Sequence, residues 1–152
     1  MTVLKKNLTG EKIMPYTLKI PEKDVTGEDK FINASGETQC VIFVQQAAKT
    51  PLTKEWRPGI HIMTSKPGEI DRGTAIATFD EHGRYPTKGD KHAAIYLSHN
   101  SMGIRVLDQW ATKGKKGIPH EVPGVSDRTI HANKPKNTRL SNRAEMFYVI
   151  ED

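Results

Sequence analysis

The clearest structural signal in the chain lies at residues 35–51, which read SGETQCVIFVQQAAKTP. Residues 35–38 offer candidates for a helix N-cap and an early acidic side chain. The apolar side chains that follow recur at helical spacing, and they are Cys40, Val41, Val44, Ala47 and Ala48. Pro51 disfavours helical geometry at the residue before it, so the helix should end near Lys49. The stretch therefore predicts a helix that carries Cys40 in its first turns.

Beyond this helix the hydrophobic period changes from about 3.6 residues to 2. Three segments alternate in this way, at 73–79, 91–97 and 103–110. Turn-forming residues separate them at 80–83 and at 98–101. The pattern predicts consecutive antiparallel strands joined by short turns.

An unbroken apolar run near the end of the chain, Met146–Ile150, predicts a last strand that is central in the sheet or covered on both faces. Because the helix precedes the strands, we expect an α+β fold, with the N-terminal helix packed on one face of an antiparallel sheet. A length of 152 residues predicts a single domain. Its core is expected at 33–110 and 144–152, since the residues up to about Ile32 are polar and rich in turn formers.

The net charge of +5 is concentrated in one segment, residues 111–139, which holds seven Lys and Arg against two Asp and Glu. This segment is rich in Gly and Pro and shows no sustained period, which indicates a basic, loop-rich region over the surface. A basic surface suits an anionic partner such as nucleic acid or a cell-wall polymer. Nucleic acid is the less favoured partner, because the basic side chains are not interleaved with aromatic ones.

Several classes of protein are excluded by simple counts. The longest apolar runs have five residues, against about 20 for a spanning helix, so no membrane-spanning segment is expected. The N-terminus lacks the features of a secretory signal peptide, which leaves the cytoplasm or export by another route. The single cysteine, Cys40, excludes an internal disulfide and a cysteine-based zinc site, and no cofactor or metal is expected.

Cys40 is nevertheless a candidate nucleophile. An ordinary thiol is only about 3% thiolate at pH 7, and the partial positive charge of a helix N-terminus lowers the pKa of a thiol placed there. Among the six histidines, His92 alone opens a predicted strand, which is rigid enough to hold a catalytic base. The others lie in predicted turns or irregular segments, at His61, His82, His99, His120 and His131.

A third polar residue follows from the predicted hairpin. If Leu97 pairs with Gly103, then His92 lies opposite Asp108 on the same face of the sheet, with Cβ atoms about 5 Å apart. Asp108 would then orient the imidazole toward Cys40. A slip of one residue would place Gln109 there instead, and its amide would stabilise an imidazolium less.

These motifs together resemble the CHAP-type and NlpC-like amidases. The segment 36–44, in which Gln39 and Cys40 open a helix, resembles the nucleophile segment of that group. The segments 73–79, 91–97 and 106–108 resemble, in order, the strand before the base, the base strand and the strand that bears the third polar residue. The chain is most similar to the small amidases associated with type VI secretion, through further motifs at 56–59, 83–86, 108–110 and 147–150.

The resemblance implies a papain-like fold and a catalytic set of Cys40, His92 and Asp108. It implies cleavage of peptide bonds in the stems or cross-bridges of bacterial peptidoglycan. It also implies an antibacterial toxin that is made in the cytoplasm, is delivered without a signal peptide and acts in the periplasm or cell wall of target bacteria. A cognate immunity protein that plugs the site is the implied protein partner.

For such chemistry the backbone N–H of Cys40 is the expected oxyanion donor, because it lies near the helix start, with Gln39 as a second donor. Tyr85, Gln109 and Trp110 are expected to contact the substrate. Two alternatives stay open at this point. One is a basic domain that binds a polyanion or nucleic acid, and the other is a papain-like acyltransferase or deamidase that uses the same Cys–His pair.

Overall fold

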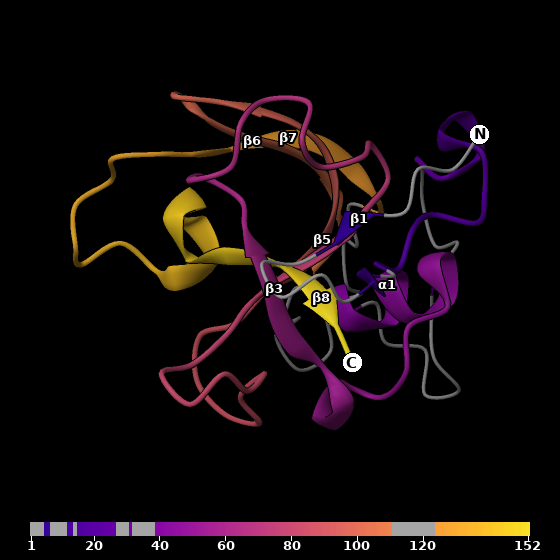
Figure 1. Cartoon of the computed structure of the whole chain (residues 1–152), viewed down its shortest axis with the longest axis horizontal. Coiled ribbons are helices and arrows are strands. Elements are labelled where there is room, and N and C mark those ends of the chain that lie inside the picture. The colour runs from indigo at the N-terminus through magenta and orange to yellow at the C-terminus, as the bar shows by residue number, and fades with distance from the viewer. Residues whose placement is uncertain (1–4, 7–11, 14, 27–30, 32–38, 111–123) are drawn as a thin grey trace, which may run out of the picture.

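In the residues that it describes, a computed structural model shows one α-helix and two β-sheets (Figure 1). It describes residues 5–6, 12–13, 15–26, 31, 39–110 and 124–152. The helix is α1 (Cys40–Ala48), and the strands of the main sheet are β3 (Arg57–His61), β4 (Ala75–Thr78), β5 (Ala93–Asn100), β6 (Gly103–Asp108), β7 (Ser126–His131) and β8 (Phe147–Glu151). The short strands β1 (Lys5–Lys6) and β2 (Lys12–Ile13) pair with each other. Four 3₁₀ turns complete the described elements: η1 (Glu22–Asp24), η2 (Thr53–Glu55), η3 (Leu140–Asn142) and η4 (Ala144–Met146).

The main sheet has the order β3-β8-β4-β5-β6-β7, and each neighbouring pair is antiparallel. The sheet is strongly curved, with β6 and β7 arching over the top of the view in Figure 1. The predicted α+β architecture is confirmed. The prediction of a central last strand is also confirmed, because β8 lies between β3 and β4.

Helix α1 begins at Cys40 and ends at Ala48, close to the predicted bounds. Its N-cap is Gln39, which makes no side-chain capping bond. The predicted N-cap candidates at 35–38 lie outside the described residues. Lys49 adopts a left-handed conformation with φ of 56°, which is a common way for a helix to end before Pro51.

The sheet carries a hydrophobic cluster on each face. One cluster lies between α1 and the sheet and includes Phe43 of the helix and Ile95 of β5. The other covers the opposite face and includes Tyr96 and Phe147. Burial of apolar surface on both faces supplies the main stabilisation of the fold. The order of the strands then sets which loops meet at each end of the sheet.

The predicted core bounds are too narrow. Val25 and Phe31, which precede the predicted start of the core at residue 33, are buried in the cluster under α1.

The interpretation of 111–139 as a loop-rich region is also wrong in part, because Ser126–His131 forms β7 and pairs with β6 over its whole length. Only Ile130 is buried within β7, so the apolar alternation that marks a strand is nearly missing there. Residues 111–123 of this segment lie outside the described residues.

The predicted register of the β5–β6 hairpin is wrong. Strand β5 continues through the expected turn at 98–101 as far as Asn100, and the hairpin reverses at the two residues that follow. Tyr96 pairs with Val106 and His99 with Ile104, with an irregularity between Tyr96 and Ser98. In the part of β5 up to Tyr96, the observed register therefore differs from the predicted one by two residues, since the predicted partner of Tyr96 is Ile104. A shift of two keeps the same side chains on the same face.

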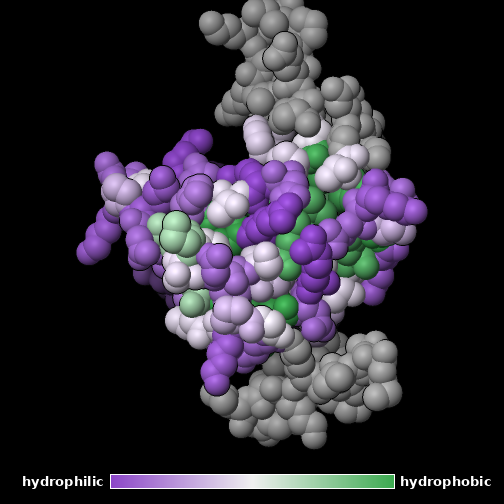
Figure 2. Space-filling model, turned by 90° about the horizontal axis from the view of Figure 1, so that it is seen from above, coloured by the Kyte–Doolittle hydropathy of each residue, from purple (hydrophilic) through white to green (hydrophobic). Residues whose placement is uncertain are grey.

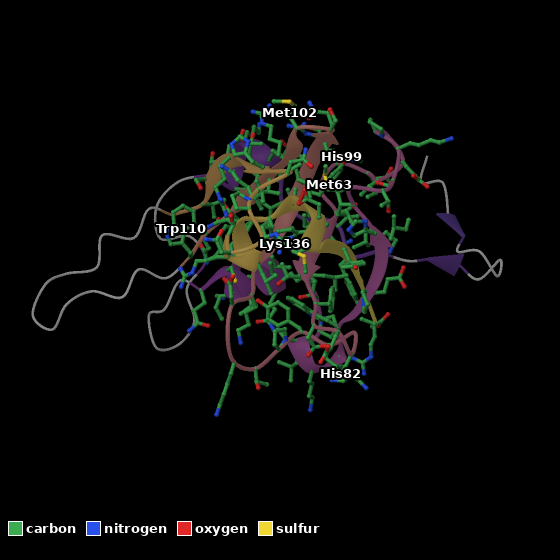
Figure 3. All side chains as sticks on the ribbon, turned by 90° about the vertical axis from the view of Figure 1, so that its left-hand side faces the viewer. Met63, His82, His99, Met102, Trp110 and Lys136 are labelled. Atoms are coloured by element: carbon green, nitrogen blue, oxygen red, sulfur yellow. The ribbon has the colours of Figure 1, made fainter. Side chains whose placement is uncertain are left out.

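His99 explains why β5 does not turn early. Its ring is buried, with Nδ1 2.7 Å from the Tyr96 hydroxyl and Nε2 3.0 Å from the Ser65 carbonyl oxygen. Figure 3 shows His99 and Met102 at the same end of the molecule, with His82 at the other. Gly103 then begins β6 with φ of 150°, and a Cβ there would collide with the carbonyl oxygen of Ile130. Only glycine fits well at position 103, which directly follows the turn residues Ser101 and Met102.

Within the described residues, no helix is both long and apolar enough to cross a bilayer.

Candidate active site

Cys40 is the first residue of α1, and its side chain is half-buried against the cluster under the helix. Its Sγ lies 3.7 Å from the hydroxyl oxygen of Tyr85 and makes a hydrogen bond with the imidazole of His92. The backbone of Ala93, at the start of β5, also makes a hydrogen bond with this sulfur. The thiol is thus contacted by groups from two other segments, the loop that holds Tyr85 and the start of β5. It lies at a helix N-terminus, where the backbone N–H groups of the first turn lack partners within the helix.

His92 lies directly before β5, and β4 holds its backbone in place. The N–H of Thr78 donates to the His92 carbonyl oxygen (2.9 Å), and the N–H of His92 donates to the Thr78 side-chain oxygen (3.0 Å). The imidazole is buried, with only 6% of the side chain exposed, and its ring meets that of Phe147 edge to face. These contacts leave the ring little freedom to rotate. The predicted rigid mounting of this histidine is therefore present.

Asp108 ends β6, and its Oδ2 lies 2.6 Å from Nε2 of His92. The observed pairing of Ile95 with Leu107, continued by one residue, sets Asp108 opposite Ala94. His92 and Asp108 are thus diagonal neighbours on one face rather than directly opposed residues, and a diagonal pair is within reach of long side chains. Because Asp108 occupies Nε2, the other ring nitrogen, Nδ1, is left for Cys40.

Arg128 of β7 belongs to the same cluster and was missed by the sequence analysis. Its Nε donates to Oδ2 of Asp108 (2.8 Å), and its Nη2 lies 2.7 Å from the same oxygen and 3.5 Å from Nε2 of His92. The guanidinium also stacks over the ring of Trp110, 5.4 Å from its centre. Arg128 fell within the segment interpreted as loop. Its spacing of two from the apolar Ile130 was the one available signal that both side chains share a sheet face.

The electrostatics of the cluster favour a charged pair. Burial raises the pKa of the Cys40 thiol, but the hydrogen bond and charge of His92 outweigh it, and this pKa lies below its ordinary value. Burial lowers the pKa of His92, but hydrogen bonds to Asp108 and Cys40 raise it to about 9. For Asp108, burial raises the pKa, and the bonds from His92 and Arg128 hold it below its ordinary range. The directions of the three shifts therefore favour a carboxylate on Asp108, an imidazolium on His92 and ionisation of the Cys40 thiol.

The other predicted site residues lie in different places. Gln109 is buried, and its Nε2 donates to the carbonyl oxygens of Phe31 (2.9 Å) and Gln39 (3.0 Å). Its side chain therefore lies away from His92 and from the substrate side, contrary to prediction, because the strand alternation points it toward the helix. It anchors the residue just before Cys40. The ring of Tyr85 is also buried, and burial, followed by the charge of Cys40, raises the pKa of its phenol.

A pocket of about 800 Å³ opens directly onto the thiol and the imidazole. Gln39, the predicted second oxyanion donor, and Trp110, a predicted substrate contact, both line this pocket, and 37% of the Trp110 surface is exposed. Figure 3 shows Trp110 at the margin of the side-chain cluster, far from His82 and Met102. The basic side chains on the wall of the pocket are Lys91, Arg128 and Arg139. Among the described residues, no three His, Cys, Asp or Glu side chains are grouped as a metal site would require.

A thiol at a helix start, an imidazole in hydrogen-bond contact with it and a buried carboxylate behind the imidazole define a cysteine hydrolase. The chain belongs to the domesticated amidase effector 2 family, whose model matches residues 19–150.

Two curated relatives and one solved structure agree with this assignment. A type VI secretion amidase effector 2 protein of Salmonella typhi is 34% identical over 121 residues, which span 74% of this chain and 84% of that protein. A domesticated amidase effector 2 of Ixodes scapularis is 35% identical over 89 residues, or 57% of this chain and 60% of that protein. A structure of type 6 secretion amidase effector 2 matches with a TM-score of 0.67 and 30% identity, over 88% of this chain and 93% of its own length.

The chain is therefore an amidase of the type VI secretion effector group, and the expected papain-like fold is confirmed. Neither a polyanion-binding domain nor an acyltransferase or deamidase is favoured by these relatives.

Proposed function

We propose that this amidase hydrolyses peptide bonds of bacterial peptidoglycan, with Cys40 as nucleophile, His92 as acid and base, and Asp108 as the residue that orients His92. The observation that carries the proposal is the continuous contact from the Cys40 sulfur through the imidazole to the buried carboxylate, beside an open pocket. The names of the relatives support the reaction class, since they describe amidase effectors. Peptidoglycan stems supply both the amide bonds and the carboxylates that suit a pocket with basic walls.

In the first half of the reaction, the Cys40 thiolate attacks the carbonyl carbon of the scissile amide. The C–N bond breaks as His92 gives its Nδ1 proton to the leaving amine, and a thioester with Cys40 remains. The developing oxyanion needs donors at the helix start, where the N–H of Cys40 has no partner within the helix. We assign a second donor to the Gln39 side chain, which lines the pocket beside it.

In the second half, water enters and His92 takes one of its protons. The resulting hydroxide attacks the thioester, the C–S bond breaks, and the thiolate and imidazolium are restored. The products are a carboxylate and an amine, so one water molecule is consumed for each bond cleaved. Asp108 holds the imidazole in the orientation that both proton transfers need, and Arg128 keeps that carboxylate ionised.

Two further parts of the function rest on family membership. We infer that type VI secretion exports the protein and that it acts in the periplasm or cell wall of target bacteria, where peptidoglycan is found. We also infer a cognate immunity protein that blocks the pocket over Cys40 and so protects the producing cell. An open, basic and functionally essential pocket is a natural target for such an inhibitor.

Digestion of purified sacculi tests the proposed reaction. We expect the wild-type protein to release new amine and carboxyl termini in equal numbers, with shortened or uncrosslinked stems in the muropeptide mass spectra. Each cleaved product should carry the mass of one added water. Intact stems after prolonged digestion would contradict the substrate assignment. Transfer of a stem to another amine without added water would instead indicate acyl transfer by the same cysteine.

Substitution of Asp108 by asparagine tests its positioning role. We expect kcat to fall about 10²-fold, less than for loss of the nucleophile, because the thiol and imidazole remain. The half-buried Arg128 charge would then lack its carboxylate and would lower the pKa of His92, so the alkaline limb of the pH–rate profile should move to lower pH. Asp127→Asn is the matched control, since Asp127 pairs with Arg105 on the surface. An unchanged pH profile for Asp108→Asn would rule out the role.

A further inference from the structure

A second pocket of about 380 Å³ lies next to the active-site pocket. The two share Arg128 and Asn142 as common wall residues, and Nη1 of Arg128 lies 3.5 Å from Oδ1 of Asn142. A smaller third pocket continues along the same edge and shares His131 and Lys134 with the second. The described residues therefore form a series of three adjoining hollows that begins at Cys40 and follows β7.

The lining of the second pocket has a consistent chemistry. It contains the cations of Arg128 and Lys134 and no Asp or Glu, Phe, Tyr or Trp among the described residues. Lys134 is exposed, and its ammonium has no ion-pair partner in the part of the chain that the structure describes. Figure 2 shows the side of the molecule toward β6 and β7. The surface on this side is mainly hydrophilic, with small apolar patches between the polar side chains. A polar, anionic occupant fits this surface better than an apolar one or a stacked sugar.

The backbone beside the pocket suits an extended chain. Strand β7 is the last strand of the sheet and pairs with β6 on one side only, among the described strands. Thr129 and His131 of β7 line the pocket. The outer edge of such a strand presents N–H and C=O groups with which an extended peptide can pair.

We propose that the second pocket is a substrate subsite that binds a carboxylate-bearing peptide extending from the scissile amide along β7. Its occupant is the second stem peptide of a cross-linked substrate, with one of its carboxylates beside Lys134. This inference rests on the proposed function. It predicts that the enzyme distinguishes cross-linked from uncrosslinked substrate by contacts made beyond the catalytic residues.

A charge reversal at Lys134 tests the subsite. Two substrates are compared: cross-linked muropeptide dimers released by a muramidase, and the same dimers with their carboxylates converted to carboxamides. For the carboxylate form, we expect Lys134→Ala to raise KM about 2- to 5-fold and Lys134→Glu about 10-fold, with kcat nearly unchanged. For the carboxamide form, neither substitution should change KM by more than about twofold.

Lys136→Glu is the matched control, because it changes the net charge by the same amount. Lys136 is exposed and lines none of the three pockets. Its kinetics should equal those of the wild type on both substrates. An equal KM for Lys134→Glu and wild type on the carboxylate dimers, with an active wild type, would overturn the subsite alone. A wild type that cleaves no muropeptide would overturn the proposed function as well.

Discussion

Replacement of Cys40 by alanine is expected to lower amidase activity on sacculi by about 10⁴-fold or more. The reason is that Cys40 is the only cysteine in the chain, and no other side chain near His92 can form the thioester. The measurement is the release of new amine termini from purified sacculi over time, at equal protein concentrations. Activity that remains at even a tenth of the wild-type level would remove Cys40 from the proposed mechanism.

Loss of activity in this variant must be separated from loss of folding. The Cys40 side chain is half-buried, and its sulfur packs at the edge of a cluster rather than at its centre. We therefore expect the thermal midpoint to change by only a few degrees. Cys40→Ser is the matched control for packing, because the hydroxyl is nearly the size of the thiol but has a far higher pKa. It should be as inactive as Cys40→Ala and as stable as the wild type.

Replacement of His92 by alanine should also remove activity, by about 10⁴-fold, since the variant lacks both the acid for the leaving amine and the base for the entering water. A second readout isolates its effect on the thiol. The single cysteine allows the rate of alkylation by iodoacetamide, followed by the mass of the whole chain, to report thiolate at one site.

The direction of the pH effect follows from the contacts. In the wild type, the hydrogen bond and charge of His92 lower the pKa of Cys40, so fast alkylation should persist below the pH at which an ordinary thiol is protonated. In His92→Ala, only the weaker contacts from the Ala93 backbone and Tyr85 would still oppose the effect of burial, so the pH midpoint of alkylation should move upward. Wild-type amidase activity should fall as the pH rises through about 9, where the imidazolium loses its proton.

His82→Ala is the matched control for this variant. His82 is exposed at the far end of the molecule in Figure 3, and its removal should leave both the activity and the alkylation midpoint unchanged. If His92→Ala alkylated with the same pH midpoint as the wild type, His92 would not influence the thiol. The ion pair between the two residues would then be excluded even if activity were lost.

Local sequence patterns were enough to predict the elements that position Cys40 and His92. The spacing of apolar residues placed Cys40 at a helix start, because helical periodicity depends only on neighbours within about two turns. The strand that follows His92 was recognisable for the same reason, since it alternates and is bounded by turn formers. The central last strand was predictable because an unbroken apolar run needs cover on both faces.

The hairpin shows where such local reasoning fails. Residues 98–101 have the composition of a turn, yet the first three of them belong to β5, where the hydrogen bond between Tyr96 and His99 holds the strand. The predicted contact between His92 and Asp108 nevertheless forms, because the register error was two residues and parity was kept. A one-residue error would have exchanged Asp108 for Gln109, which faces the helix instead.

The sequence alone was sufficient to predict the fold class and to single out Cys40 and His92 as the proposed nucleophile and base, because each of these depends on residues close together in the chain. Only the tertiary structure could bring Arg128 to Asp108, since that contact needs β7 to pair with β6 across residues 111–123. The hollows along β7 likewise depend on long-range pairing. A buried carboxylate, held ionised by charges from two other segments, is a property of the packed sheet, because burial and distance together set the energy of each charge.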